Sequence, residues 1–202
     1  MKVALIGASG NAGSRILQEL VDRSHAVLAV ARQAVKIPAL AGVTARSVNA
    51  NDGAELAATI KGCDAVISAL KFTAADTQGL IDAVGRSGVA RYLVVGGAGS
   101  LELAPGVLEM DSPKFPAHVK PEAAAGARFL AQLRASPLDW TYLSPSRFFQ
   151  PGARTGVFRL GTDQLLTGAD GKSAISYEDF AVALVDELER PRHSRRRFTV
   201  GY

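Results

Sequence analysis

The residues with the clearest chemical potential form a glycine-rich stretch near the amino terminus. The sequence Gly7-Ala8-Ser9-Gly10-Asn11-Ala12-Gly13 has the spacing G-x-x-G-x-x-G and separates an apolar run from an amphipathic one. Gly7 permits a tight turn, Gly10 lets the backbone approach a pyrophosphate, and Gly13 lets a helix lie close to the strand. The helix start adds free N–H groups that attract phosphate. We therefore predict a dinucleotide-binding loop; a purely structural turn is the alternative, and no Gly-Lys-Ser/Thr follows to indicate a P-loop.

The end of the second apolar run favours one form of nicotinamide dinucleotide. NAD sites usually place Asp or Glu about 20 residues after the glycines, but Ala31-Arg32-Gln33 stands there. No acidic residue occurs between Ser24 and Asn51. A guanidinium can donate forked hydrogen bonds to a 2′-phosphate, which a carboxylate would repel. We expect NADP(H) to be preferred over NAD(H), and a solvated Arg32 at a strand end is the alternative.

Candidate proton donors lie in or beside the Gly- and Pro-rich segment 96–120, which is predicted to be a long, shaped loop. They are Ser100, His118 and Lys120, and His118 is suited to acid–base work because histidine titrates near neutral pH. Each also has an ordinary explanation, namely turn capping for Ser100, solvation for His118 and a helix start for Lys120. No His, Cys, Asp or Glu pattern has metal-ligand spacing, so no metal is expected.

The acid–base dyad of many dehydrogenases is absent. Those enzymes use Tyr-x-x-x-Lys, in which the lysine lowers the pKa of the phenol. The residues four positions after Tyr92, Tyr142 and Tyr177 are Gly96, Ser146 and Ala181, and no lysine follows Tyr202. This argues against ordinary alcohol–ketone oxidoreduction. Hydride transfer to a flavin or quinone-like acceptor remains open, because orientation can suffice when the acceptor is itself electron-poor.

The glycine motif opens an alternating pattern of strands and helices. Short apolar runs typical of buried parallel strands lie at 3–6, 26–31, 44–48, 65–67, 92–95 and 140–143. Helical periodicity lies at 11–23, 53–61, 74–87 and 122–133, with Asp52 as a candidate N-cap and Pro121 in a first turn. This alternation predicts an α/β fold with a doubly wound parallel sheet, the Rossmann fold.

The last quarter of the chain is predicted to be a small extension on the substrate side. We expect one domain over 1–202, with a core over about 1–147 and the extension over about 148–202. Short strands are expected at 157–160, 164–167 and 198–200, and a capping box at 176–179 predicts a helix to about Glu189. The adjacent Phe148 and Phe149 either line a substrate opening or belong to the core.

Composition narrows the location and the partners. The chain carries a formal charge of +4 and 48% hydrophobic residues, values typical of a soluble globular protein. Cys63 is the only cysteine, and no segment resembles a leader or a membrane span, so a cytoplasmic location is expected. The arginines at 190, 192 and 195–197 are interpreted as a helix end and a solvated turn. We expect a small-molecule electron acceptor as partner, no nucleic acid or membrane, and a monomer or homodimer.

Several segments together resemble the atypical short-chain dehydrogenase/reductases. They are the glycine motif, Arg32, Val94–Leu101, Leu138–Pro145, Arg154–Gly156, Ile175–Asp179 and Arg197–Tyr202. More narrowly, the chain resembles the NmrA-like group of proposed NADH-flavin reductases, which are related to biliverdin-IXβ/flavin reductase. The resemblance covers nearly the whole chain, and the later segments are more specific than the glycines.

The resemblance implies positions for individual residues. Gly7, Ser9, Gly10, Asn11 and Gly13 would hold the pyrophosphate, Arg32 the adenosine phosphate, and Asp52 would lie near adenine unless it only caps a helix. Ala69 and Leu70 would line the ribose, and Gly97, Ser144 and Pro145 would lie near the nicotinamide. The function expected is an NADPH-preferring reductase that uses a flavin or quinone-like molecule as substrate, not as a prosthetic group. The alternatives are a non-catalytic NADP(H)-sensing regulator and an NAD(P)-dependent epimerase or isomerase.

Overall fold

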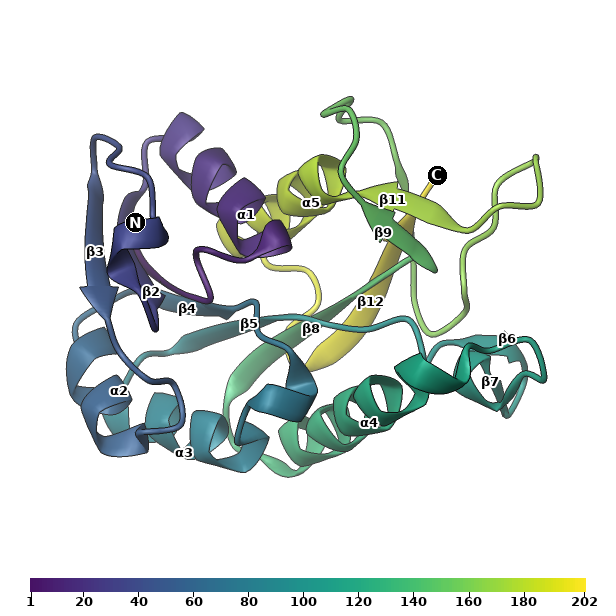
Figure 1. Ribbon diagram of the computed structural model, residues 1–202, viewed down its shortest axis with the longest axis horizontal. Helices are drawn as coiled ribbons and strands as arrows, with labels where there is room; N and C mark the ends of the chain where they lie inside the picture. Colours follow the sequence, from purple (N-terminus) through teal and green to yellow (C-terminus); the bar gives the residue numbers. More distant parts are fainter.

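The computed structural model describes all 202 residues and contains a central sheet covered by helices on both faces (Figure 1). Its strand order is β10-β12-β8-β5-β4-β1-β2-β3. Every neighbouring pair is parallel except β10 and β12. The strands are β1 (Lys2–Ile6), β2 (Ala26–Ala31), β3 (Val43–Ser47), β4 (Ala65–Ser68), β5 (Arg91–Val95), β8 (Asp139–Pro145), β10 (Arg159–Gly161) and β12 (Arg196–Gly201). The predicted doubly wound parallel sheet is confirmed.

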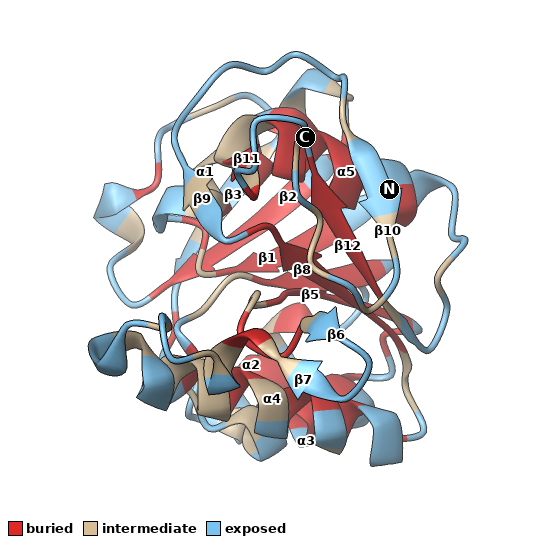
Figure 2. Ribbon diagram, turned by 90° about the vertical axis from the view of Figure 1, so that its right-hand side faces the viewer, coloured by how far each residue is buried: buried red, intermediate tan, exposed pale blue.

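Two groups of helices sandwich the sheet. Helices α1 (Asn11–Asp22) and α5 (Tyr177–Glu189) cover one face, and α2 (Gly53–Ile60), α3 (Thr77–Ser87) and α4 (Lys120–Ala135) cover the other (Figure 1). Along β1, Val3 and Leu5 join the core beneath α1 and α5, whereas Ala4 and Ile6 join the opposite core. This alternation follows from the pleat of a strand buried on both faces. The buried residues accordingly concentrate in the sheet and on the helix faces toward it (Figure 2).

Side-chain caps set the starts of three helices. The Asp52 carboxylate accepts from the Glu55 N–H at 3.0 Å and caps α2 as predicted. Ser176 accepts from the Asp179 N–H at 2.9 Å at the start of α5. Helix α3 begins at 77 and not at 74, because Asp76 caps it and residues 72–74 form a separate 3-10 turn. Capping residues therefore define the helix boundaries more sharply than periodicity does.

The segments around the carboxyl end of the sheet differ most from expectation. The predicted loop 96–120 contains a hairpin, β6 (Glu102–Ala104) and β7 (Val107–Leu108). A parallel pair, β9 (Phe148–Gln150) and β11 (Ala174–Ser176), was not predicted because each strand has only three residues. The strand expected at 164–167 is wrong: Gln164 makes one isolated bridge to Glu102, and the Leu165 N–H donates to the Glu102 carbonyl.

The basic run near the carboxyl terminus is not wholly solvated. The Arg197 side chain is only 5% exposed and pairs with Asp163, with its Nε donating at 2.8 Å. It also donates to the Ser100 carbonyl at 2.8 Å, so it ties β12 to the loop after β5. The expectation of a solvated turn is thus wrong for this residue.

None of the helices is long and apolar enough to span a bilayer.

Candidate functional site

The turn from β1 into α1 requires glycine at two positions for steric reasons. Gly7 has φ of +86°, and a Cβ there would lie 2.4 Å from the Ala69 carbonyl oxygen. A Cβ on Gly13 would lie 2.1 Å from the Gly7 carbonyl oxygen, so α1 can pack on the turn only without a side chain. Gly10 differs, because its nearest neighbour would be the Gly7 oxygen at 3.3 Å and it lines the open groove. The three glycines therefore shape the turn, the packing and the groove surface respectively.

The amino end of α1 is available to an anion. Gly10 is its N-cap, no side chain caps the first turn, and that turn contains no acidic residue. The first N–H groups of a helix have no acceptor within the helix and carry the positive end of its dipole. The first residues of α1, Asn11 and Ala12, line the same cavity as Gly10. The turn thus fits the pyrophosphate of a dinucleotide by its own geometry.

Two connected cavities extend from this turn along the carboxyl ends of the strands. The narrower one, about 280 Å³, reaches from Gly7 and Ser9 to Arg32 and the segment 48–51. The larger one, about 730 Å³, opens between the loop after β5 and strand β9. Both are lined by Gly10, Ala69, Leu70 and Lys71. They meet where the strand order reverses between β1 and β4, which is where open α/β sheets bind ligands.

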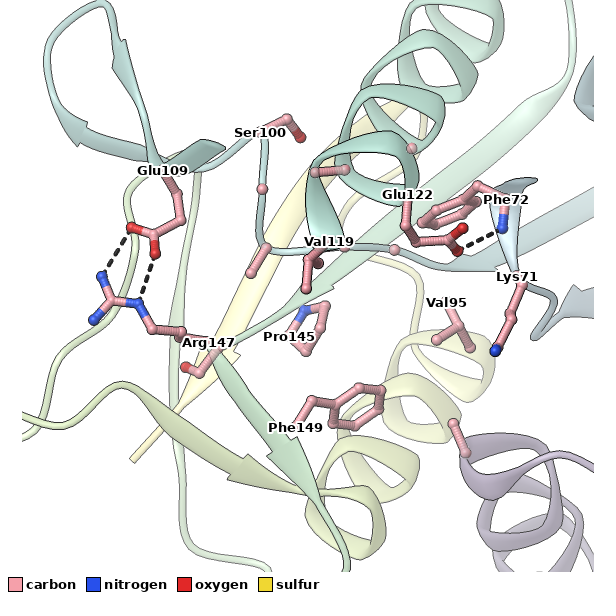
Figure 3. Close-up of a pocket in the computed structure, with 18 of the residues that line it drawn as sticks. Lys71, Phe72, Val95, Ser100, Glu109, Val119, Glu122, Pro145, Arg147 and Phe149 are labelled. Carbon is pink, nitrogen blue, oxygen red and sulfur yellow. Dashed lines mark hydrogen bonds and ion pairs between the residues drawn. The ribbon is translucent and has the colours of Figure 1, made fainter. Parts of the chain in front are cut away.

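Six aromatic side chains are among the residues that line the larger cavity. The aromatic residues that line it are Phe72, Phe115, Tyr142, Phe148, Phe149 and Tyr177. Phe149 packs edge-on against Tyr177 with ring centroids 4.4 Å apart, and Phe148 is 49% exposed. Figure 3 shows Phe149 facing Val119 and Pro145 across the cavity. The phenylalanine pair therefore lines the opening, and such walls suit a flat, semi-apolar molecule.

The buried tyrosine of the cavity is bound on both sides of its hydroxyl. The Tyr142 hydroxyl accepts from the Gly97 N–H at 3.2 Å and donates to the Gly126 carbonyl at 3.3 Å. Complete burial raises the pKa of Tyr142 far above its usual range. A phenol that is fully buried and already donating to a carbonyl is poorly placed to act as a general acid. Tyr142 therefore joins β8, α4 and the loop after β5.

Two carboxylates of the cavity are occupied by other groups of the protein. Glu122 accepts from the Phe72 N–H at 2.7 Å and from the Thr73 N–H at 3.0 Å (Figure 3). Glu109 accepts two hydrogen bonds from Arg147, from Nε at 2.6 Å and from Nη2 at 2.8 Å. The hydrogen bond with Glu109 raises the pKa of Arg147 against the opposing effect of burial. Neither carboxylate is free to serve as a general base.

The three predicted proton donors do not meet. Ser100 lines the larger cavity, but its hydroxyl accepts from Arg197 Nη1 at 3.0 Å. His118 and Lys120 are exposed and are not among the residues that line either cavity. Lys120 is the first residue of α4, the ordinary alternative that the sequence offered.

Most predicted cofactor residues border the two cavities. The narrower one is lined by Gly7, Ser9, Gly10, Arg32, Ala69 and Leu70, and the larger one also by Asn11, Gly97 and Pro145. Asp52 borders neither and caps α2, while Gly13 lies beneath the turn. Ser144 is fully buried, and its hydroxyl has no hydrogen-bond partner.

Sequence reasoning did not identify several residues that line the larger cavity. Lys71 and Phe72 directly follow the predicted pair at 69–70, so extending that segment would have found them. Glu109 and Arg147 are 38 residues apart and meet only through the tertiary fold. No local pattern marks either residue as a partner of the other.

Comparison with known proteins agrees with this geometry. A family model described as NAD(P)H-binding matches residues 7–191. The chain belongs to this NAD(P)H-binding family. The uncharacterized protein YwnB of Bacillus subtilis is 41% identical over 214 residues, which cover 99% of this chain and 98% of that protein. The resemblance drawn from the sequence segments is confirmed at this level.

Two solved structures are close to this NAD(P)H-binding protein over its entire length. A proposed epimerase from Bacteroides thetaiotaomicron is 40% identical, has a TM-score of 0.95, and is matched over 100% of this chain and 96% of its own. A proposed NADH-flavin reductase from Streptococcus pneumoniae is 35% identical, has a TM-score of 0.86, and is matched over 100% and 99%. The shared fold is thus associated with more than one named activity, and the site must distinguish them.

Proposed function

We propose that this NAD(P)H-binding protein is an NADPH-preferring reductase that passes hydride to a flat, electron-poor acceptor such as a flavin or quinone. The observation that carries the proposal is the continuity of the two cavities. A narrow groove that ends at Arg32 joins, through the glycine turn, a wider pocket with aromatic walls. One end fits a phosphorylated adenosine, and the other fits a planar ring beside the nicotinamide.

The residues of the chain would bind and orient the reactants. The amino end of α1 would hold the pyrophosphate, and Arg32 the 2′-phosphate. Phe149 and Tyr177 would support a flat ring, since their own rings pack together at the cavity wall. When bound, NADPH supplies a hydride, and the acceptor takes up this hydride and a proton from water, which leaves NADP⁺ and the reduced acceptor.

The pattern of side chains favours reduction over epimerisation. An epimerase that uses NAD(P) oxidises a carbinol and then reduces the ketone on its other face, and it needs a side chain that takes up and returns the hydroxyl proton. The Tyr142 hydroxyl and the carboxylates of Glu109 and Glu122 are all bound by other groups of the protein. Hydride transfer to a flavin needs positioning more than acid–base chemistry.

Turnover with a panel of acceptors tests the proposal. The oxidation of NADPH and of NADH is followed at about 340 nm with FMN, riboflavin and a simple quinone, and cofactor binding is measured by calorimetry. We expect turnover with at least one acceptor, and faster turnover with NADPH. Tight NADPH binding without any turnover would contradict the reductase and favour the NADP(H)-sensing regulator. NADP(H) that copurifies and is not consumed would favour an epimerase.

A further inference from the structure

The larger cavity keeps positive charge that its own carboxylates do not neutralise. Five charged side chains line it, namely Lys71, Lys114, Arg147, Glu109 and Glu122. Glu109 is paired with Arg147, and Glu122 accepts from the segment 72–73. Neither lysine forms an ion pair in the structure, and both are exposed. The three cations exceed the two carboxylates by one, and Lys71 and Lys114 are the cations left without a paired carboxylate.

Arg147 is held so that one edge of its guanidinium remains free. Its Nε and Nη2 donate to the two oxygens of Glu109, whose side chain is only 5% exposed. This pairing uses the side edge of the guanidinium. The end edge, formed by Nη1 and the second N–H of Nη2, has no acceptor within the protein, and the side chain is 44% exposed. A guanidinium fixed in this way is preorganised to bind a second oxyanion in a bidentate manner.

The position of Arg147 separates it from the dinucleotide groove. Figure 3 shows Arg147 and Glu109 at one end of the cavity and Lys71 with Phe72 at the other, with Pro145 and Phe149 between them. Lys71 also lines the narrower groove, which assigns it to the dinucleotide end. Lys114 and Ser112 come from the loop that carries Glu109 and line only the larger cavity.

We propose that this outer end binds a phosphate monoester carried by the acceptor, with Arg147 and Lys114 as the specificity-determining residues. The placement of the ring rests on the proposed reductase function. A phosphate monoester carries a charge of about −1.5 to −2 at neutral pH, and it would meet the unpaired Lys114 ammonium and the free edge of Arg147, whose charge is shared with Glu109. Its three terminal oxygens can be shared among the free edge of Arg147, the Lys114 ammonium and the Ser112 hydroxyl. The acceptor class is thus a flat ring joined to a phosphate, as in a flavin mononucleotide.

FMN and riboflavin provide the test, because they share one ring system and differ in the terminal phosphate. The Kd of each flavin is measured by flavin fluorescence quenching with NADP⁺ present, and kcat/KM is measured with NADPH. We expect the wild-type protein to prefer FMN by about tenfold or more, the range of one or two charge-assisted contacts. Lys114→Met and Arg147→Lys should each reduce this preference by about fivefold.

The variants are chosen so that folding is preserved. Arg147→Lys keeps a cation against the buried Glu109 and removes the free guanidinium edge. Lys61→Met is the matched control, because Lys61 is also exposed but lies at the end of α2 and lines neither cavity. It should leave the FMN-to-riboflavin ratio unchanged.

The outcomes separate this inference from the proposed function. Equal Kd values for FMN and riboflavin, or a ratio unaffected in both variants, would overturn the phosphate site. Turnover of both flavins at equal efficiency would support the reductase and overturn the site. FMN binding that depends on Lys114 without any turnover would support the site and contradict the reductase.

Discussion

At the level of single residues, we expect charge in the narrower groove to set the preference between NADPH and NADH. Arg32 and Lys71 are the charged side chains that line it, and no carboxylate does. Lys71 lies where the groove joins the larger cavity, so Arg32 is the charged side chain at the other end of the groove. A carboxylate there would accept from ribose hydroxyls, whereas a guanidinium requires an anion.

Replacement of Arg32 tests the cofactor preference. Arg32→Ala should raise the Kd for NADPH about tenfold to a hundredfold, since a charge-assisted contact is worth about 1.5–3 kcal/mol. The Kd for NADH, which has no 2′-phosphate, should change little. Calorimetric titration of both cofactors measures the difference, with Arg46→Ala as control because Arg46 on β3 lines neither of these cavities. Equal effects on both cofactors would show that Arg32 does not contact the phosphate.

Replacement of Tyr142 tests whether its hydroxyl takes part in proton transfer. Tyr142→Phe keeps the ring in the core and removes the bridge between Gly97 and Gly126. The free energy of unfolding should fall by about 1 kcal/mol, the typical net value of a neutral hydrogen bond. Acceptor reduction should remain within about threefold of wild type because hydride transfer does not require this phenol. A loss of a hundredfold or more in kcat would mean that Tyr142 is a general acid.

At the scale of elements, the strand–turn–helix unit from β1 to α1 combines two demands on glycine. Close packing requires glycine at position 13, because the Gly7 carbonyl oxygen occupies the space that a side chain would fill. Gly10 lines both cavities, and a Cβ there would meet only the Gly7 carbonyl oxygen at 3.3 Å and the Ala69 carbonyl oxygen at 3.9 Å. Stability and binding should therefore separate between the two positions.

Two alanine substitutions make this separation measurable. Gly13→Ala should lower the free energy of unfolding by about 1–3 kcal/mol through overpacking. Gly10→Ala should lower it by less than about 1 kcal/mol and should still weaken NADPH binding. Denaturant unfolding and calorimetry report the two quantities. Strong binding by a fully stable Gly10→Ala protein would refute the assignment of this turn to the pyrophosphate.

At the scale of the whole molecule, carboxylates hold the extended segment 151–158 against α1 and α5. Glu19 is 3% exposed and accepts from Arg154 and Arg23, each within 2.9 Å. Asp179 is fully buried and accepts from the Thr155 and Gly156 N–H groups, both at 2.8 Å. Because most of the segment is exposed, these few contacts determine its position.

We expect the same carboxylates to make the free energy of unfolding depend on pH in the acid range. The hydrogen bond from Arg154 lowers the pKa of Glu19 below its usual value near 4.5; burial opposes this effect and Arg23 adds to it. Burial alone would raise the pKa of Asp179, but the hydrogen bonds from Thr155 and Gly156 outweigh it and lower the pKa. A carboxyl group with a lowered folded-state pKa stabilises the fold above its unfolded pKa. This stabilisation is lost as the pH falls through the folded-state value.

Unfolding measured between neutral pH and about pH 3 tests this linkage. Wild-type stability should fall below about pH 4.5, near the ordinary pKa of the carboxyl groups. Glu19→Gln should lower the free energy of unfolding at pH 7 by about 1.5–3 kcal/mol, and its stability should depend less on acid. Asp82→Asn is the control, because Asp82 lies on α3 and accepts from the Gln78 side chain. If the free energy of unfolding of Glu19→Gln falls with pH as steeply as that of the wild type, Glu19 is not a source of the pH dependence.

The order of residues along the chain was enough to predict the layered fold and the glycine turn after β1. Periodicity and turn chemistry act over a few residues, so the strands, the cap at Asp52 and the glycine turn follow from local order. The match of 26–31 with β2 is an example. Boundaries set by caps, such as the start of α3, were less well predicted because a single hydrogen bond moves them.

The lining of the larger cavity, in contrast, depends on contacts that form only in the assembled fold. Arg147 meets Glu109, Arg197 meets Ser100, and Glu122 meets the backbone at Phe72, all across more than 35 residues of chain. Such pairs leave no periodic trace, because their partners lie on loops whose paths depend on the assembled sheet and helices. The two cavities also meet only in the assembled sheet. They meet at the carboxyl ends of β1 and β4, where the strand order reverses.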